Sequence, residues 1–161
     1  MSQKRSNDKF YMGAAAVAVT TVLAACQPAQ DPQAALEEAN LEKAVYCMEL
    51  LEKHHDLDTA GRECFGDTYI QHTPWFPDGK EAVLERFADR LEQNPDKTID
   101  IKRTAADGDL VWIHLHSKRN ADDELGNAVI NIFRMKDGRF VEHWNVVQRV
   151  PEESANDNTM F

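Results

Sequence analysis

Histidine side chains are the strongest candidates for chemistry in this sequence. Four of them follow the first predicted helix along the chain, at His72, His114, His116 and His143. Imidazole titrates near pH 6.5, so it can accept and return a proton at neutral pH. One of the four could remove a proton from the carbon next to a carbonyl group, while Tyr69 or a tryptophan N–H binds the resulting oxyanion. The rate would then rise between about pH 6 and 7.

Two other interpretations of these histidines stay open. They could donate hydrogen bonds to buried backbone carbonyl groups, or lie half-exposed at a sheet edge. The spacing His114-x-His116 would also suit a zinc site completed by His72 or His143. No cysteine or acidic ligand joins them at a motif spacing, so we predict no metal site.

The first part of the chain is predicted to be helical. Apolar residues recur every three to four positions from Gln33, which indicates a helix that ends near His54-His55. The glutamates of this helix, Glu52 included, are assigned to its polar faces. A short second helix is expected to follow Asp56 and to reach about Cys64.

A third helix is expected after a brief extended segment at residues 69–72. It starts at Pro77-Asp78-Gly79, where Asp78 can serve as the N-cap and Glu81 as its capping-box partner. Its apolar stripe contains Val83 and Phe87, and Asn94-Pro95 ends it.

After Pro95 the hydrophobic period changes from 3.6 to 2, which indicates strands. Two Asp-Gly pairs, at 107–108 and 137–138, are strong hairpin signals. Helices followed by an antiparallel meander predict an α+β fold, with three helices packed on one face of a curved antiparallel sheet around a cone-shaped pocket. The expected strands are Thr98–Ala105, Leu110–Lys118, Asn127–Met135 and Phe140–Arg149.

Strand parity sorts the candidate residues into faces without deciding which face is inside. The face of the second meander strand that carries Trp112, His114 and His116 is either the pocket wall or a polar outer surface. The opposite face of that strand, with Val111, Ile113 and Leu115, is apolar and is expected to pack. Residues that share a face on the later strands are Val129, Asn131 and Phe133; His143, Asn145 and Val147; and Glu142, Trp144 and Val146.

The N-terminus has the pattern of an export signal. Basic residues precede the apolar stretch 11–23, which is too short for the roughly 20 residues of a transmembrane helix. Leu23-Ala24-Ala25-Cys26 resembles the lipobox of bacterial lipoproteins, which implies cleavage before Cys26 and a lipid on its sulfur; the alternative is an ordinary secretory signal with an incidental cysteine. We expect a signal peptide over 1–25, a tether over 26–32, a domain over 33–150 and a tail over 151–161. The mature protein would be exported and anchored by lipid to the cell envelope.

Export also bears on the state of the remaining cysteines. If Cys26 carries lipid, Cys47 and Cys64 remain as a pair in an oxidising compartment, where they either form a disulfide or stay as buried thiols.

The formal net charge is −10 for the whole chain. A surface of this charge repels phosphate backbones, so nucleic acid is excluded as a partner.

Five short motifs in order resemble the SnoaL-like branch of the nuclear transport factor 2-like superfamily. They are Tyr-Ile-Gln-His-Thr-Pro at 69–74, Asp-Gly-Lys-Glu-Ala at 78–82, Asn-Ile-Phe-Arg at 131–134, Asp-Gly-Arg at 137–139 and Val-Glu-His-Trp-Asn-Val-Val-Gln at 141–148. The resemblance implies a cone of three helices on a curved sheet, usually as a homodimer. It also implies cyclase, isomerase or lyase chemistry without a metal or organic cofactor, or plain ligand binding.

This chain departs from the family at two positions where relatives commonly carry aspartate, here Asn131 and Asn145. An amide cannot take up a proton near neutral pH, so the base would have to be a histidine. Two hypotheses follow: a cofactor-free enzyme acting on a small, mostly apolar carbonyl compound, or a lipid-anchored module that only binds such a compound. The expected pocket residues are Tyr69, Trp75, Phe76, Trp112, Asn131, Phe133, Trp144 and Asn145.

Overall fold

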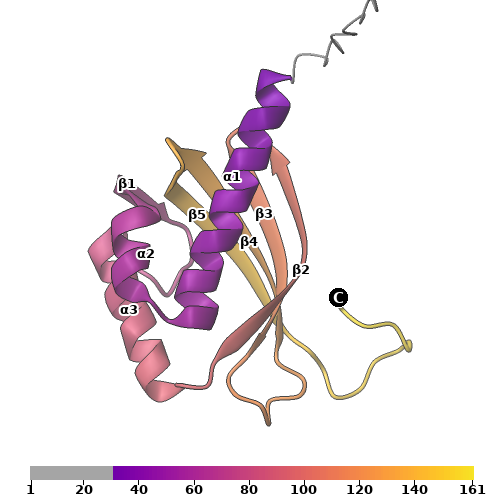
Figure 1. Ribbon diagram of the computed structural model, residues 1–161. Helices are drawn as coiled ribbons and strands as arrows, with labels where there is room; N and C mark the ends of the chain where they lie inside the picture. The colour runs from indigo at the N-terminus through magenta and orange to yellow at the C-terminus, as the bar shows by residue number, and fades with distance from the viewer. Residues whose placement is uncertain (1–30) are drawn as a thin grey trace, which may run out of the picture.

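The computed structural model describes residues 31–161 (Figure 1). The predicted signal peptide, Cys26 and the tether as far as residue 30 lie outside the described residues. The described helices are α1 (Pro32–Glu49), the π-helical turn η1 (Leu50–His54), α2 (Leu57–Glu63) and α3 (Lys80–Gln93). The strands are β1 (Phe65–Gln71), β2 (Thr98–Asp107), β3 (Leu110–Lys118), β4 (Asn127–Lys136) and β5 (Arg139–Arg149). The prediction of an α+β fold is confirmed.

The first helix begins one residue earlier than predicted, because Pro32 occupies its first turn and Asp31 caps it. The Asp31 carboxylate accepts a hydrogen bond from the backbone N–H of Gln33. The helix continues into η1 and stops at His55, whose φ of 57° is left-handed. Asp56 then caps α2 by accepting from the N–H of Thr59.

The predicted capping box of α3 is wrong. The N-cap is Gly79, whose φ of 98° favours glycine, and no side chain caps this end. The Asp78 carboxylate accepts a hydrogen bond from the backbone N–H of Gln71 instead, at 2.7 Å. Asp78 therefore fixes the loop between β1 and α3, a long-range role that the local pattern did not contain.

The sheet contains the predicted meander, but it is mixed rather than wholly antiparallel. Strands β2 to β5 pair antiparallel in sequence order, while β1 pairs parallel with β5 at the edge, giving the order β1-β5-β4-β3-β2. The extended segment predicted at 69–72 corresponds to the end of β1. A parallel partner is joined to its neighbour by a long crossover, and here α3 and three strands supply it, so no short-range turn signal marked the pairing.

The helices and the sheet enclose one apolar core. Figure 1 shows the strands curving around the helices, with α1 lying across them. Cys47 of α1 and Cys64 after α2 are joined by a disulfide within this core, with their Cα atoms 5.6 Å apart. Within residues 31–161, no helix combines the length and apolar character that crossing a bilayer requires.

Candidate functional site

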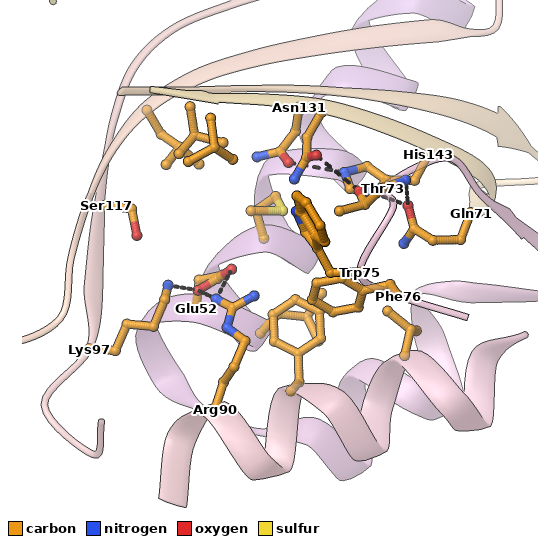
Figure 2. Close-up of a pocket in the computed structure, with 18 of the residues that line it drawn as sticks. Glu52, Gln71, Thr73, Trp75, Phe76, Arg90, Lys97, Ser117, Asn131 and His143 are labelled. Carbon is orange, nitrogen blue, oxygen red and sulfur yellow. Dashed lines mark hydrogen bonds and ion pairs between the residues drawn. The ribbon is translucent and has the colours of Figure 1, made fainter. Parts of the chain in front are cut away.

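A cavity of about 350 Å³ opens between the helices and the sheet (Figure 2). Side chains from α1, η1, β1, α3 and strands β3 to β5 line it, so it is the inside of the predicted cone. The lining is apolar over much of its area. Of the expected pocket residues, six lie there: Tyr69, Trp75, Phe76, Asn131, Phe133 and Asn145.

His143 is the histidine that the fold brings to this cavity. It lies on β5, is 8% exposed, and stacks on Phe133 of the neighbouring strand with ring centroids 4.7 Å apart. Its Nδ1 lies 2.8 Å from Gln71 Oε1, and its Nε2 lies 3.0 Å from Asn131 Oδ1 (Figure 2). Gln71 reaches His143 because the parallel pairing of β1 with β5 sets these two residues side by side.

The hydrogen bonds around His143 determine which ring nitrogen carries the proton. Gln71 Oε1 also accepts from the backbone N–H of Thr73, which orients the amide so that its oxygen faces the ring. Nδ1 is therefore the donor. In the neutral ring Nε2 is then an acceptor. The Asn131 oxygen lies 3.0 Å from it, and a half rotation of the side-chain amide would place the Nδ2 donor there instead.

Burial lowers the pKa of His143 to about 4, because the charged imidazolium loses its hydration inside the cavity wall. The ring is accordingly neutral at pH 7 and able to accept a proton. The sequence predicted an ordinary imidazole pKa for the catalytic histidine. The structure corrects that expectation for His143.

Further hydrogen-bonding groups surround this end of the cavity. Thr73 Oγ1 donates to Asn145 Oδ1 at 2.9 Å, which leaves the Asn145 amide nitrogen available as a donor. The Tyr69 hydroxyl group is buried in the lining, and its burial raises the pKa of Tyr69 well above the usual value. Tyr69 therefore stays protonated and can donate to an oxygen of a ligand.

The other three candidate histidines do not reach the cavity. His114 and His116 lie on the outer face of β3, where both stack on Phe161 of the C-terminal tail. His116 Nε2 bonds to the Leu125 carbonyl group, and His114 Nδ1 contacts Arg103. The apolar face of β3 points inward, and its residues Val111, Ile113 and Leu115 are buried in the core. Because side chains alternate along a strand, His114 and His116 point outward.

His72 and Trp144 also lie outside the cavity, on the outer face of the sheet. Their rings stack in parallel with centroids 4.7 Å apart, and His72 Nε2 lies 2.9 Å from Glu142 Oε1. Trp112, on the outer face of β3, is likewise absent from the described lining. The expectation that Trp112 and Trp144 line the pocket is therefore wrong, since their strand parity opposes that of the cavity residues.

Sequence reasoning missed a charged cluster in the lining, formed by Glu52, Arg90 and Lys97. Arg90 Nη2 donates to both carboxylate oxygens of Glu52, at 3.1 and 3.2 Å, and Lys97 Nζ contacts Glu52 Oε2 (Figure 2). Burial by itself would raise the pKa of Glu52, but Arg90 and Lys97 outweigh it and hold that pKa below the usual value.

Glu52 was assigned to a polar helix face, and that prediction is wrong. It is 7% exposed and lies four residues after the buried Met48, which puts it on the same face of the continuous helix formed by α1 and η1. The spacing could have identified it. Arg90 and Lys97 supply the charges that make its burial possible, and they come from parts of the sequence that no local pattern connects to it.

The described residues contain no group of three or more histidine, cysteine or carboxylate side chains placed to hold a metal ion. The His114-x-His116 pair lies on the outer face of the sheet, across it from His143.

Comparison with known proteins gives a family and a set of similar folds. A model of the SnoaL-like domain matches residues 46–143. The solved structure of IdmH, a proposed polyketide cyclase from Streptomyces antibioticus, is similar over 67% of this chain and 91% of that one, at 21% identity and a TM-score of 0.56. A proposed ketosteroid isomerase from Kribbella flavida is similar over 74% of this chain and 85% of that one, at 12% identity and a TM-score of 0.60.

A SnoaL-like protein of unknown function from Burkholderia thailandensis is similar over 70% of this chain and 98% of that one, at 21% identity and a TM-score of 0.57. No curated protein matches the sequence. At these identities the likeness to solved structures is one of fold.

Proposed function

This chain belongs to the SnoaL-like domain family, and from that premise we propose that its cavity binds a small, mostly apolar carbonyl compound on which His143 acts as a general base. The reaction would be of the isomerase, lyase or aldol-cyclase type and would use no cofactor. The observation that carries the proposal is the position of His143 in the cavity wall, neutral at pH 7 and held in one tautomer by Gln71.

The proposed step is removal of a proton from the carbon next to the ligand carbonyl group. His143 Nε2 accepts the proton, and the C–H electron pair moves into the enolate, whose oxygen is met by the Asn145 amide or the Tyr69 hydroxyl. Nε2 becomes available when the Asn131 amide transfers its hydrogen bond from the ring to the ligand. The proton can then return to another carbon, or the enolate carbon can attack a second carbonyl group.

A non-catalytic binding module is the second candidate function, and one observation favours it. The Asn131 amide occupies His143 Nε2, and the described residues at this end of the cavity include no carboxylate. A site of this kind can hold a carbonyl oxygen through amide and hydroxyl donors without moving a proton.

Replacing His143 by Gln distinguishes the two functions. If His143 is the base, His143→Gln lowers the rate on a reactive ketone by roughly 10²- to 10⁴-fold while ligand affinity changes only a few-fold. His114→Gln, on the outer face, is the matched control and keeps the rate. Turnover is followed by exchange of the α-protons in deuterated water across a panel of apolar ketones. Binding without exchange in the wild-type protein would leave the binding module as the function, and Asn131→Asp would then be the variant to test for new activity.

We also propose that the mature protein is an exported lipoprotein and a homodimer. The signal pattern before Cys26 supports export and anchoring. Exposed apolar side chains on the outer sheet face, among them Ile130 and Val146, support self-association. Sedimentation velocity of residues 27–161 tests the dimer, and a monomer mass at micromolar concentration would contradict it.

A further inference from the structure

We propose that the ligand of this cavity carries a carboxylate group, which binds Arg90 and Lys97, in addition to the carbonyl group that faces His143. The substrate class would then be apolar oxo acids rather than neutral ketones. The inference rests on the proposed function in that it takes the cavity to hold a small carbonyl compound. Figure 2 shows the Arg90 and Lys97 cluster across the cavity from Asn131 and His143.

The charges of the cluster do not balance. Glu52 is the one carboxylate among the described lining residues, and it faces the two cations Arg90 and Lys97, so the cluster carries a net charge of +1. A third lining cation, Arg119, contacts Asp123, which lies outside the described lining and also pairs with Arg149. The whole chain has a formal charge of −10, so the positive character belongs to the cavity and not to the protein surface in general.

Arg90 is held in a position where it can bind an anion. Its guanidinium group lies 4.9 Å from the ring centroid of Phe87, and a single nitrogen, Nη2, makes both contacts with Glu52. In the described part of the chain, every fully buried side-chain nitrogen has a hydrogen-bond partner. The Arg90 nitrogens that make no hydrogen bond are therefore accessible to solvent and not sealed in the core. A guanidinium group with free donors in a partly desolvated site is suited to a carboxylate.

A purely structural role for the cluster accounts for one cation and not for two. A single Arg90–Glu52 pair would already join η1 to α3. Adding Lys97, whose side chain is only 9% exposed, places a second positive charge against the first, and burial lowers the pKa of Lys97. Glu52 has to serve both cations, so one positive charge of the cluster is left without a carboxylate of its own, and a ligand carboxylate would supply it.

The experiment compares oxo acids with their methyl esters by isothermal titration calorimetry. The probes are dodecanoates with a ketone at carbon 4, 6 or 8, and the corresponding esters, which have the same apolar body without the charge. We expect at least one acid to bind the wild-type protein roughly tenfold more tightly than its ester. Arg90→Gln should bring that ratio close to one. Glu52→Gln should increase it, because it removes the competing carboxylate.

Arg86→Gln is the matched control, since Arg86 lies on the same helix outside the described cavity lining and should leave the ratio unchanged. If the Glu52 or Arg90 variant does not fold, raising the salt concentration of the wild-type titration to about 0.5 M should weaken the acid and not the ester. Equal binding of acid and ester by the wild-type protein would overturn the carboxylate inference and leave the proposed function standing. Binding of neither would overturn the proposed function itself.

Discussion

His143 links the candidate site to the stability of the fold. Its folded-state pKa of about 4 lies below the unfolded value of about 6.5, so between these pH values the unfolded chain binds one more proton than the native protein. The stability that neutral His143 contributes is therefore present above pH 6.5 and is lost as the pH falls towards 4.

We predict that this linkage contributes about 3 kcal/mol to the loss of unfolding free energy between pH 7 and pH 4. Urea unfolding at several pH values measures it. His143→Gln should make the pH dependence shallower by about that amount, whereas His54→Gln, at an exposed position, should not. Parallel curves for the wild-type protein and His143→Gln would show that burial does not depress this pKa.

The same pKa changes the expected activity profile. An ordinary imidazole would give a rate that rises between pH 6 and 7, but a base with a pKa of about 4 is already deprotonated there. We therefore expect kcat/KM to be level from pH 6 to pH 8 in a steady-state assay. A sigmoidal rise centred near pH 6.5 would point to a different base.

Trp75 should report on ligand binding by fluorescence. It lines the cavity with 77% of its surface exposed, whereas Trp112 and Trp144 lie on the outer face of the sheet. An apolar ligand that covers Trp75 should change the emission of the wild-type protein. Trp75→Phe should abolish this change, and Trp144→Phe should retain it. Loss of the signal in Trp144→Phe instead would place the ligand on the outer face.

At the scale of elements, the disulfide joins α1 to the end of α2 within the apolar core. The Cys47–Cys64 bond closes a loop of 17 residues, and a loop of that length contributes about 3 kcal/mol in the chain-entropy model. We predict that reduction lowers the free energy of unfolding by roughly 2–4 kcal/mol.

The measurement uses residues 27–161, in which these are the only two cysteines. Thermal unfolding is compared with and without reductant, and alkylation followed by mass spectrometry counts the free thiols. Rapid alkylation of both cysteines in the native protein without reductant would contradict the bond.

The element scale also explains which parts of the fold were predictable. The meander strands were predicted to within two residues at each end, because alternation and Asp-Gly turns are local signals. At Asp137-Gly138 both residues have positive φ, as a type I′ turn requires. The pairing of β1 with β5 had no such signal. Gln71 and its partner His143 lie 72 positions apart along the chain, and only the folded sheet brings them together.

At the scale of the whole molecule, the expected lipid anchor precedes the described domain. Cys26→Ser removes the thiol that would accept lipid. We predict that the wild-type protein partitions into the detergent-rich phase and takes up labelled fatty acid, while Cys26→Ser stays a precursor without label. The Cys47→Ser variant is the control for a cysteine with no role in anchoring. Equal labelling of the wild type and Cys26→Ser would rule out a lipoprotein.

The sequence by itself determined the order of helices and strands, the family and the faces that residues share. These properties follow from hydrophobic period, turn residues and short motifs, which are all local. It also led to the hypothesis that a histidine would carry any proton transfer, because Asn131 and Asn145 cannot take up a proton near neutral pH.

Only the tertiary structure decided which of the candidate residues reach the cavity. The apolar face of β3 was expected to pack. On β5, parity puts His143 and Trp144 on opposite faces, but the sequence did not indicate which of them lies inside. The packing of Val111 and its neighbours against α1 settled it and left His143 inside. The cavity charges were decided in the same way, since Glu52, Arg90 and Lys97 come from separate parts of the chain and meet only where the folded chain brings them together.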